Sequence, residues 1–131
     1  PYDYFGSLSD EIWRACRLVV DTGIHAFGWS RQEAIDYLLA HSAISQYDAE
    51  SETDRYIGWP GQACAYKIGQ LAIVGLRREA EAALGASFDP RAFHDCVLGA
   101  GALPLPVLEK RVKRWIELRA DEARPGDVPS P

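Results

Sequence analysis

The sequence contains no methionine among its 131 residues, and it begins at Pro1. A complete reading frame needs an initiator residue, so we expect the chain to be a piece of a longer protein. Paired cysteines are also missing: Cys16, Cys64 and Cys96 are odd in number and form no Cys-x-x-Cys motif. A disulfide framework and a thiolate metal site are therefore both disfavoured, and we expect buried free thiols.

Two further absences exclude classes of partner. No apolar run reaches the roughly 20 residues that a membrane span requires. No strong positive charge is present either, because the net charge is -5, which argues against a nucleic-acid-binding surface. One local basic segment is interpreted as a solvated helix face, and it contains Lys110, Arg111, Lys113 and Arg114.

The pattern of apolar residues predicts helices throughout and no convincing strand. We expect an all-α fold of about six helices without a sheet. Residues 1–120 are predicted to form a single helical domain, and residues 121–131 a disordered tail. The longest predicted helix follows Pro60, and because it is apolar nearly all round from Ala63 to Leu76, it should be a buried central helix.

Local signals predict several helix boundaries. Ser30 and Glu33 have the spacing of a capping box. Pro60 suits the first turn of the long helix, and Asp89 with Pro90 suits the start of another. Residues 1–6 are predicted to be a turn-rich lead-in to a helix over about 7–28. Residues 42–51 are predicted to be a polar connection before a short helix at 52–57.

Potential hydrogen-bond donors gather around the break at Pro60. Arginine binds carboxylates through two parallel hydrogen bonds, and a tyrosine hydroxyl can stabilise a developing oxyanion. These groups do not cleave a bond by themselves, and the sequence has no zinc-binding His-Glu-x-x-His helix, nucleophile elbow or phosphate-binding loop. The residues concerned are Arg55, Tyr56, Gln62, Tyr66 and Lys67.

A second candidate group lies on the first long helix. Arg17, Asp21 and His25 are each four residues from the next, so their side chains lie on one face. In one interpretation, Asp21 orients His25 as a positioned proton donor or acceptor. In the other, the three residues form an ordinary surface ladder of ion pairs, each contributing about a few tenths of a kcal/mol. The sequence leaves both interpretations open.

Several of these segments resemble, in the same order, the C-terminal region of the bacterial domain-of-unknown-function 885 family. The most specific segment is Pro60-Gly-Gln-Ala-Cys-Ala-Tyr66-Lys-Ile-Gly69 together with Arg55-Tyr56. The other matching runs are residues 17–30, 88–95, 101–108 and 115–116. The resemblance covers almost the whole chain up to about Ala120.

The family is similar to helical zinc metallopeptidases of the gluzincin kind. The resemblance implies that the zinc ligands lie upstream of Pro1, so no cofactor is expected in this chain and zinc is expected in the parent protein. Expected partners are that upstream zinc-binding region and a peptide-like substrate, and the sequence leaves the location open between the bacterial cytoplasm and the periplasm. The implied roles are oxyanion donation by Tyr66, Tyr56 and His25, with His25 oriented by Asp21, and substrate binding by Arg55, Lys67 and Gln62.

Two functions therefore follow from the sequence. The first is one wall of the substrate cleft in a zinc-dependent peptidase-like hydrolase, inactive in isolation. The alternative is a non-catalytic helical module that binds another protein.

Overall fold

The computed structural model describes residues 2–122. Six α-helices and two short 3₁₀ helices follow one another, and residues 2–122 contain no strand, which confirms the all-α prediction. The chain divides into two compact units, one up to residue 68 and the other from residue 69. The predicted single domain over residues 1–120 stays a prediction, and most of the predicted tail, residues 123–131, lies outside the described part.

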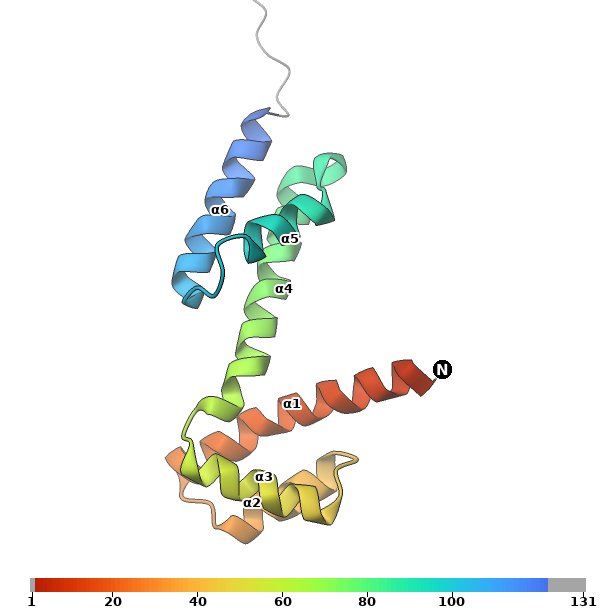
Figure 1. Cartoon of the computed structure of the whole chain (residues 1–131), viewed down its shortest axis with the longest axis vertical. Helices are drawn as coiled ribbons and strands as arrows, with labels where there is room; N and C mark the ends of the chain where they lie inside the picture. The colour runs from red at the N-terminus through yellow and green to blue at the C-terminus, as the bar shows by residue number, and fades with distance from the viewer. Residues whose placement is uncertain (1, 123–131) are drawn as a thin grey trace, which may run out of the picture. The chain divides into compact units, whose positions relative to one another are not determined.

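The first unit is a group of helices packed around one apolar core. Helix α1 contacts α2, α3 and the 3₁₀ helix η1, and α2 contacts α3 (Figure 1). The elements are α1 (Tyr2–Phe27), α2 (Arg31–His41), α3 (Gln46–Gly58), η1 (Gln62–Cys64) and the beginning of α4 (Ala65–Leu84). The core contains Cys16, Val20, Ala34, Ile35, Leu38, Ala49, Tyr56 and Ala63.

The corner between α1 and α2 is fixed by local chemistry. Gly28 has φ 70°, a left-handed conformation that glycine adopts without strain. The Trp29 amide then donates to the Gly23 carbonyl at 2.9 Å. A Cβ on Gly23 would lie 2.4 Å from the Trp29 ring, so only glycine allows this contact. The capping box that starts α2 at Ser30 and Glu33 is confirmed.

Three boundaries in the first unit differ from the prediction. Helix α1 begins at Tyr2 rather than after Gly6, because a single glycine costs a helix only about 1 kcal/mol and does not break it. Helix α3 begins at Gln46, since the Ser45 side chain accepts a hydrogen bond from the Asp48 amide. Pro60 lies in a turn, and α4 begins only at Ala65.

The second unit has a separate core. It contains the rest of α4, the 3₁₀ helix η2 (Gly85–Ser87), α5 (Pro90–Leu98) and α6 (Leu105–Glu122), and α5 packs on α6. The predicted start of α5 is confirmed, with Asp89 as N-cap and Pro90 in the first turn. The buried residues of the second unit's core are Leu76, Ala80, Leu84, Phe93, Cys96, Val97, Leu108, Val112 and Ile116.

The prediction that α4 is buried nearly all round is wrong for the described residues. Only Leu76, Ala80 and Leu84 of this helix are buried. Apolar composition indicates that a helix needs a covering surface, but it does not say which chain supplies that surface. Large apolar side chains of α4 that remain exposed are Tyr66, Ile68, Leu71 and Val74. No helix within residues 2–122 combines the length and apolarity needed to cross a membrane.

The cysteines are free thiols, as predicted. Cys16 and Cys96 are buried, whereas Cys64 is half-buried. Burial raises the pKa of all three thiols. Because the thiolate is the reactive form, this environment suppresses nucleophilic and metal-binding chemistry at these residues.

Candidate functional site

The first unit contains a cluster of interacting polar side chains, which we call the polar cluster. Gln62, at the start of η1, lies at its centre. The Gln62 side-chain oxygen accepts hydrogen bonds from Arg55 at 2.6 Å and from Arg17 at 3.4 Å. This one amide therefore joins α1 to α3. The polar cluster contains Arg17, Glu52, Arg55, Tyr56 and Gln62, and Asp21 is joined to it through the amide of Gly61, the residue before Gln62.

Glu52 is the acidic member on α3. Its carboxylate accepts a hydrogen bond from the Tyr56 hydroxyl at 2.8 Å and two from the Arg55 guanidinium. Although burial by itself raises the Glu52 pKa, the hydrogen bonds from Arg55 and Tyr56 lower it overall. Burial and the hydrogen bond to Glu52 raise the Tyr56 pKa. Tyr56 is therefore a neutral donor and Glu52 an ionised acceptor at neutral pH.

Asp21 fixes the turn that precedes η1. Both of its carboxylate oxygens accept a hydrogen bond from the Gly61 amide, each at 3.0 Å. Gly61 has φ 80°, so the amide reaches this position through a left-handed backbone conformation. Asp21 is only 4% exposed. The bond to Gly61 thus supplies part of the compensation that a buried carboxylate needs.

Arg17 lies among aromatic rings and is only 4% exposed. Its guanidinium carbon is 4.6 Å from the centre of the Tyr66 ring, 5.4 Å from that of Tyr56 and 5.8 Å from that of Trp13. Within the described residues, Arg17 Nε and Trp13 Nε1 are buried without a hydrogen-bond partner. A buried guanidinium held by ring faces is electrostatically stabilised but incompletely hydrogen-bonded.

Tyr66 is the member of this group that faces outward. Half of its surface is exposed, whereas Tyr56 is 1% exposed. Arg14 also lies over the Tyr66 ring, with 5.4 Å between the guanidinium carbon and the ring centre. The first turn of α4 therefore presents a tyrosine whose ring has two guanidinium groups near it.

His25 and Lys67 have other partners. His25 Nε2 lies 3.0 Å from the Tyr56 backbone oxygen. Because a carbonyl only accepts, Nε2 must carry the proton in this contact. The bonds of Asp21 described above go to Gly61, so the predicted orienting of His25 by Asp21 stays a prediction. Lys67 forms an ion pair with Glu11 of α1.

Sequence analysis missed two members of this region. Glu52 precedes Arg55 by three residues and Tyr56 by four, which is the spacing at which helical side chains meet, so it could have been found. Trp13 is four residues before Arg17 and could have been found in the same way. The convergence of α1, α3 and η1 on Gln62 depends on the tertiary fold and has no local signal.

The arrangement contains several hydrogen-bond donors, of which Arg55 and Lys67 are bound to acidic side chains. Residues 2–122 contain no group of three or more histidine, cysteine, aspartate or glutamate side chains suited to hold a metal ion. The described residues therefore do not fit a zinc site of their own.

A solved structure and a family model both match this chain. The chain is 46% identical to a protein whose crystal structure is described as that of "the putative lipoprotein from Colwellia psychrerythraea". The match has a TM-score of 0.84 and covers 86% of this chain, but only 19% of that one. No curated protein matches the chain.

A family model described as "Bacterial protein of unknown function (DUF885)" matches residues 1–112. Because this match extends over most of the sequence, the chain belongs to the DUF885 family of bacterial proteins.

Proposed function

We propose that this chain is the C-terminal helical portion of a zinc-dependent peptidase-like hydrolase and forms one wall of its substrate cleft. The observation that carries the proposal is the exposed Tyr66 ring on the buried guanidinium of Arg17. Burying a charge without complete hydrogen bonding costs several kcal/mol, roughly, so stability alone is a poor reason for this arrangement. The relative whose chain is far longer supports a larger parent protein.

The proposed roles follow from accessibility. Tyr66 is exposed, so its hydroxyl can donate to the oxygen of a scissile carbonyl as negative charge develops there. His25 is also exposed and is proposed as a second donor; because its Nε2 donates to the Tyr56 carbonyl, it would donate to a substrate through Nδ1 when both ring nitrogens carry a proton. Tyr56 already donates to Glu52. In the proposal it therefore acts indirectly, by fixing the charge of Glu52.

The proposed substrate anchors are Arg55, Gln62 and Lys67. Arg55 is bound to Glu52 and Lys67 to Glu11. A substrate carboxylate would therefore have to compete with these acids for the cations. Gln62 accepts from both arginines, and in the proposal it keeps Arg17 and Arg55 at a fixed separation.

Zinc would be bound by the upstream region of the parent protein. The metal would polarise the carbonyl and activate water there. We assign no zinc ligand and no metal-dependent step to the described residues, in keeping with their donor set.

The test uses the full-length parent protein, assayed for zinc content and for hydrolysis of peptide substrates with and without chelator. Tyr66→Phe should lower kcat by about 10²-fold or more, because one oxyanion donor is lost. Tyr47→Phe is the control, since Tyr47 is exposed on α3 and outside the polar cluster. Absence of metal-dependent hydrolysis contradicts the proposed function. Unchanged turnover in Tyr66→Phe with normal folding removes Tyr66 from the mechanism.

The second candidate function is a non-catalytic interaction module, and it is favoured by the bonds that already occupy donors near Pro60: Arg55 is bound to Glu52, and Tyr56 donates to Glu52. Large apolar side chains are also exposed on α1, where Phe5 is 65% exposed and Leu8 49%. An independent module should be monomeric and unfold cooperatively, whereas a detached cleft wall should associate through such surfaces. Analytical ultracentrifugation of the 131-residue chain distinguishes the two.

A further inference from the structure

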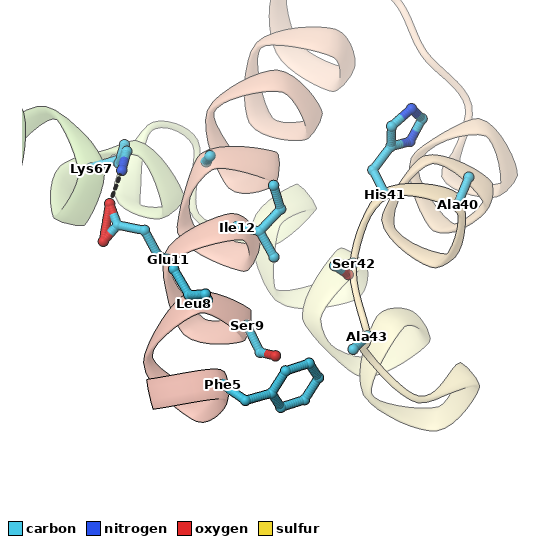
Figure 2. A pocket seen from close by; sticks show the side chains of 11 residues that line it. Phe5, Leu8, Ser9, Glu11, Ile12, Ala40, His41, Ser42, Ala43 and Lys67 are labelled. Carbon is cyan, nitrogen blue, oxygen red and sulfur yellow. Dashed lines mark hydrogen bonds and ion pairs between the residues drawn. The ribbon is translucent and has the colours of Figure 1, made fainter. Parts of the chain in front are cut away.

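An apolar groove, which we call the α1 groove, lies within the first unit. Side chains of α1 line one side, and residues 40–43, where α2 ends, line the other (Figure 2). The groove volume is about 770 Å³. Its apolar lining consists of Phe5, Leu8, Ile12, Ala15, Ala40 and Ala43.

The α1 side of the groove carries a row of large apolar side chains that are exposed to solvent. Phe5, Leu8 and Ile12 are three and four residues apart, so they lie on one helix face. They are 65%, 49% and 48% exposed. Contiguous apolar surface of this kind marks a binding site more often than scattered exposed residues do.

Charge at the groove is already balanced. Lys67 and Glu11, which both line it, form an ion pair with each other (Figure 2). The side chain of Lys67 is only 15% exposed. The groove therefore favours an apolar ligand over a charged one.

We infer that the α1 groove seats an apolar helix from the part of the parent polypeptide that precedes Pro1. This inference rests on the proposed function, which makes this chain the C-terminal portion of a longer parent protein. The related crystal structure contains this fold at 46% identity within a chain of which the present sequence covers 19%. The remaining polypeptide of such a parent is covalently joined to the chain that carries the groove. A helix in it therefore binds the groove at high effective concentration.

The geometry favours a helix as the occupant. Residues 2–122 contain no strand and hence no open sheet edge to which an extended segment could add. A segment crossing an apolar groove must satisfy its own backbone hydrogen bonds, which a helix does. From Phe5 to Ala15 the groove side of α1 is about 15 Å long, or about three turns. Small residues on the opposite side, Ala40 and Ala43, leave room for large side chains spaced three and four apart.

The test is cysteine labelling by a maleimide, followed by site-resolved mass spectrometry. Leu8→Cys is placed in the full-length parent and in the 131-residue chain, with folding checked by circular dichroism. Labelling at this position should be about tenfold slower or more in the parent, because the reagent then needs local opening of the covering helix. Ser7→Cys is the matched control, since Ser7 is an exposed neighbour on α1 that does not line the groove.

Slow labelling of Leu8→Cys in the parent, with Ser7→Cys changed much less, supports the inference. Equal rates for Leu8→Cys in the two proteins overturn it. Protection that disappears on dilution also overturns it, since the occupant is then a second copy. A reading frame without an upstream segment has the same consequence. The measurement involves neither zinc nor hydrolysis, so an active parent with an open groove contradicts only the groove, and an inactive parent with a covered groove contradicts only the proposed function.

Discussion

The two units differ in the kinds of side chain that they bury. The nine buried residues of the second unit's core are all apolar or cysteine. The buried charged and polar residues of the described chain, Arg17, Asp21 and Thr53, all belong to the first unit. An apolar core stabilises without needing exact partners, whereas buried charges are costly unless each is bonded. The second unit is therefore stabilised mainly by apolar packing, whereas the first unit combines an apolar core with buried hydrogen bonds.

The largest expected effect is on packing in the second unit. Phe93 is 1% exposed and contacts the rings of Phe88 and Trp115. Phe93→Ala should lower the free energy of unfolding by about 3–5 kcal/mol through lost burial and a cavity. Urea unfolding measures the loss, and hydrogen exchange should localise it to the second unit. Leu98→Ala, at an exposed position, is the control. Equal losses in both variants would contradict the packing account.

The next effect tests hydrogen bonding in the first unit. Asp21→Ala leaves the Gly61 amide without its carboxylate acceptor and should cost about 1.5–3 kcal/mol of unfolding free energy. Asp21→Asn keeps one acceptor oxygen and should lose less. Exchange of the Gly61 amide should accelerate more in Asp21→Ala than in Asp21→Asn. A fully stable Asp21→Ala protein would show that the buried carboxylate is not compensated in this way.

A smaller effect should depend on pH. Tyr56→Phe removes the hydroxyl that donates to Glu52 and should cost about 1 kcal/mol at pH 8. The raised Tyr56 pKa means that the unfolded phenol, near its ordinary value of 10.0, ionises first. The unfolded state then binds fewer protons, so wild-type stability falls as pH rises above 10, and by about 1 kcal/mol at pH 11.

The phenylalanine variant has no such loss. The stability difference between wild type and Tyr56→Phe should therefore shrink between pH 8 and pH 11 in urea unfolding measurements. Tyr47→Phe, at an exposed position outside the polar cluster, is the control. A constant difference across this range would show that Tyr56 ionises equally in the folded and unfolded states.

The smallest effect is on the surface of the second unit. Lys113→Ala removes the exposed pair with Glu109. Solvent screens such pairs strongly, so the midpoint of urea unfolding should not change measurably. A clear loss would show that the contrast between the units is incomplete and that charge also stabilises the second one.

The fold was predictable where a boundary has a local cause. The capping box at Ser30 and Glu33 and the Asp89–Pro90 start each depend on residues within one turn. The exposure of α4 was not predictable. Apolar composition indicates that a helix needs a covering surface, but it does not say which segment or chain supplies that surface. The candidate site was likewise predictable only in part. The donors around Pro60 were found by type, but their meeting at Gln62 depends on helices distant in sequence.

Gly61 sets a condition on redesign of the turn before η1. Nothing lies within 4 Å of a Cβ built at this position, so the surrounding space would admit a side chain. The backbone, at φ 80°, disfavours any L-residue there by about 1–2 kcal/mol. The left-handed backbone conformation, rather than a lack of space for a side chain, therefore limits which residues can replace Gly61. A D-amino acid introduced by chemical synthesis would match the turn and narrow the conformations open to the unfolded chain.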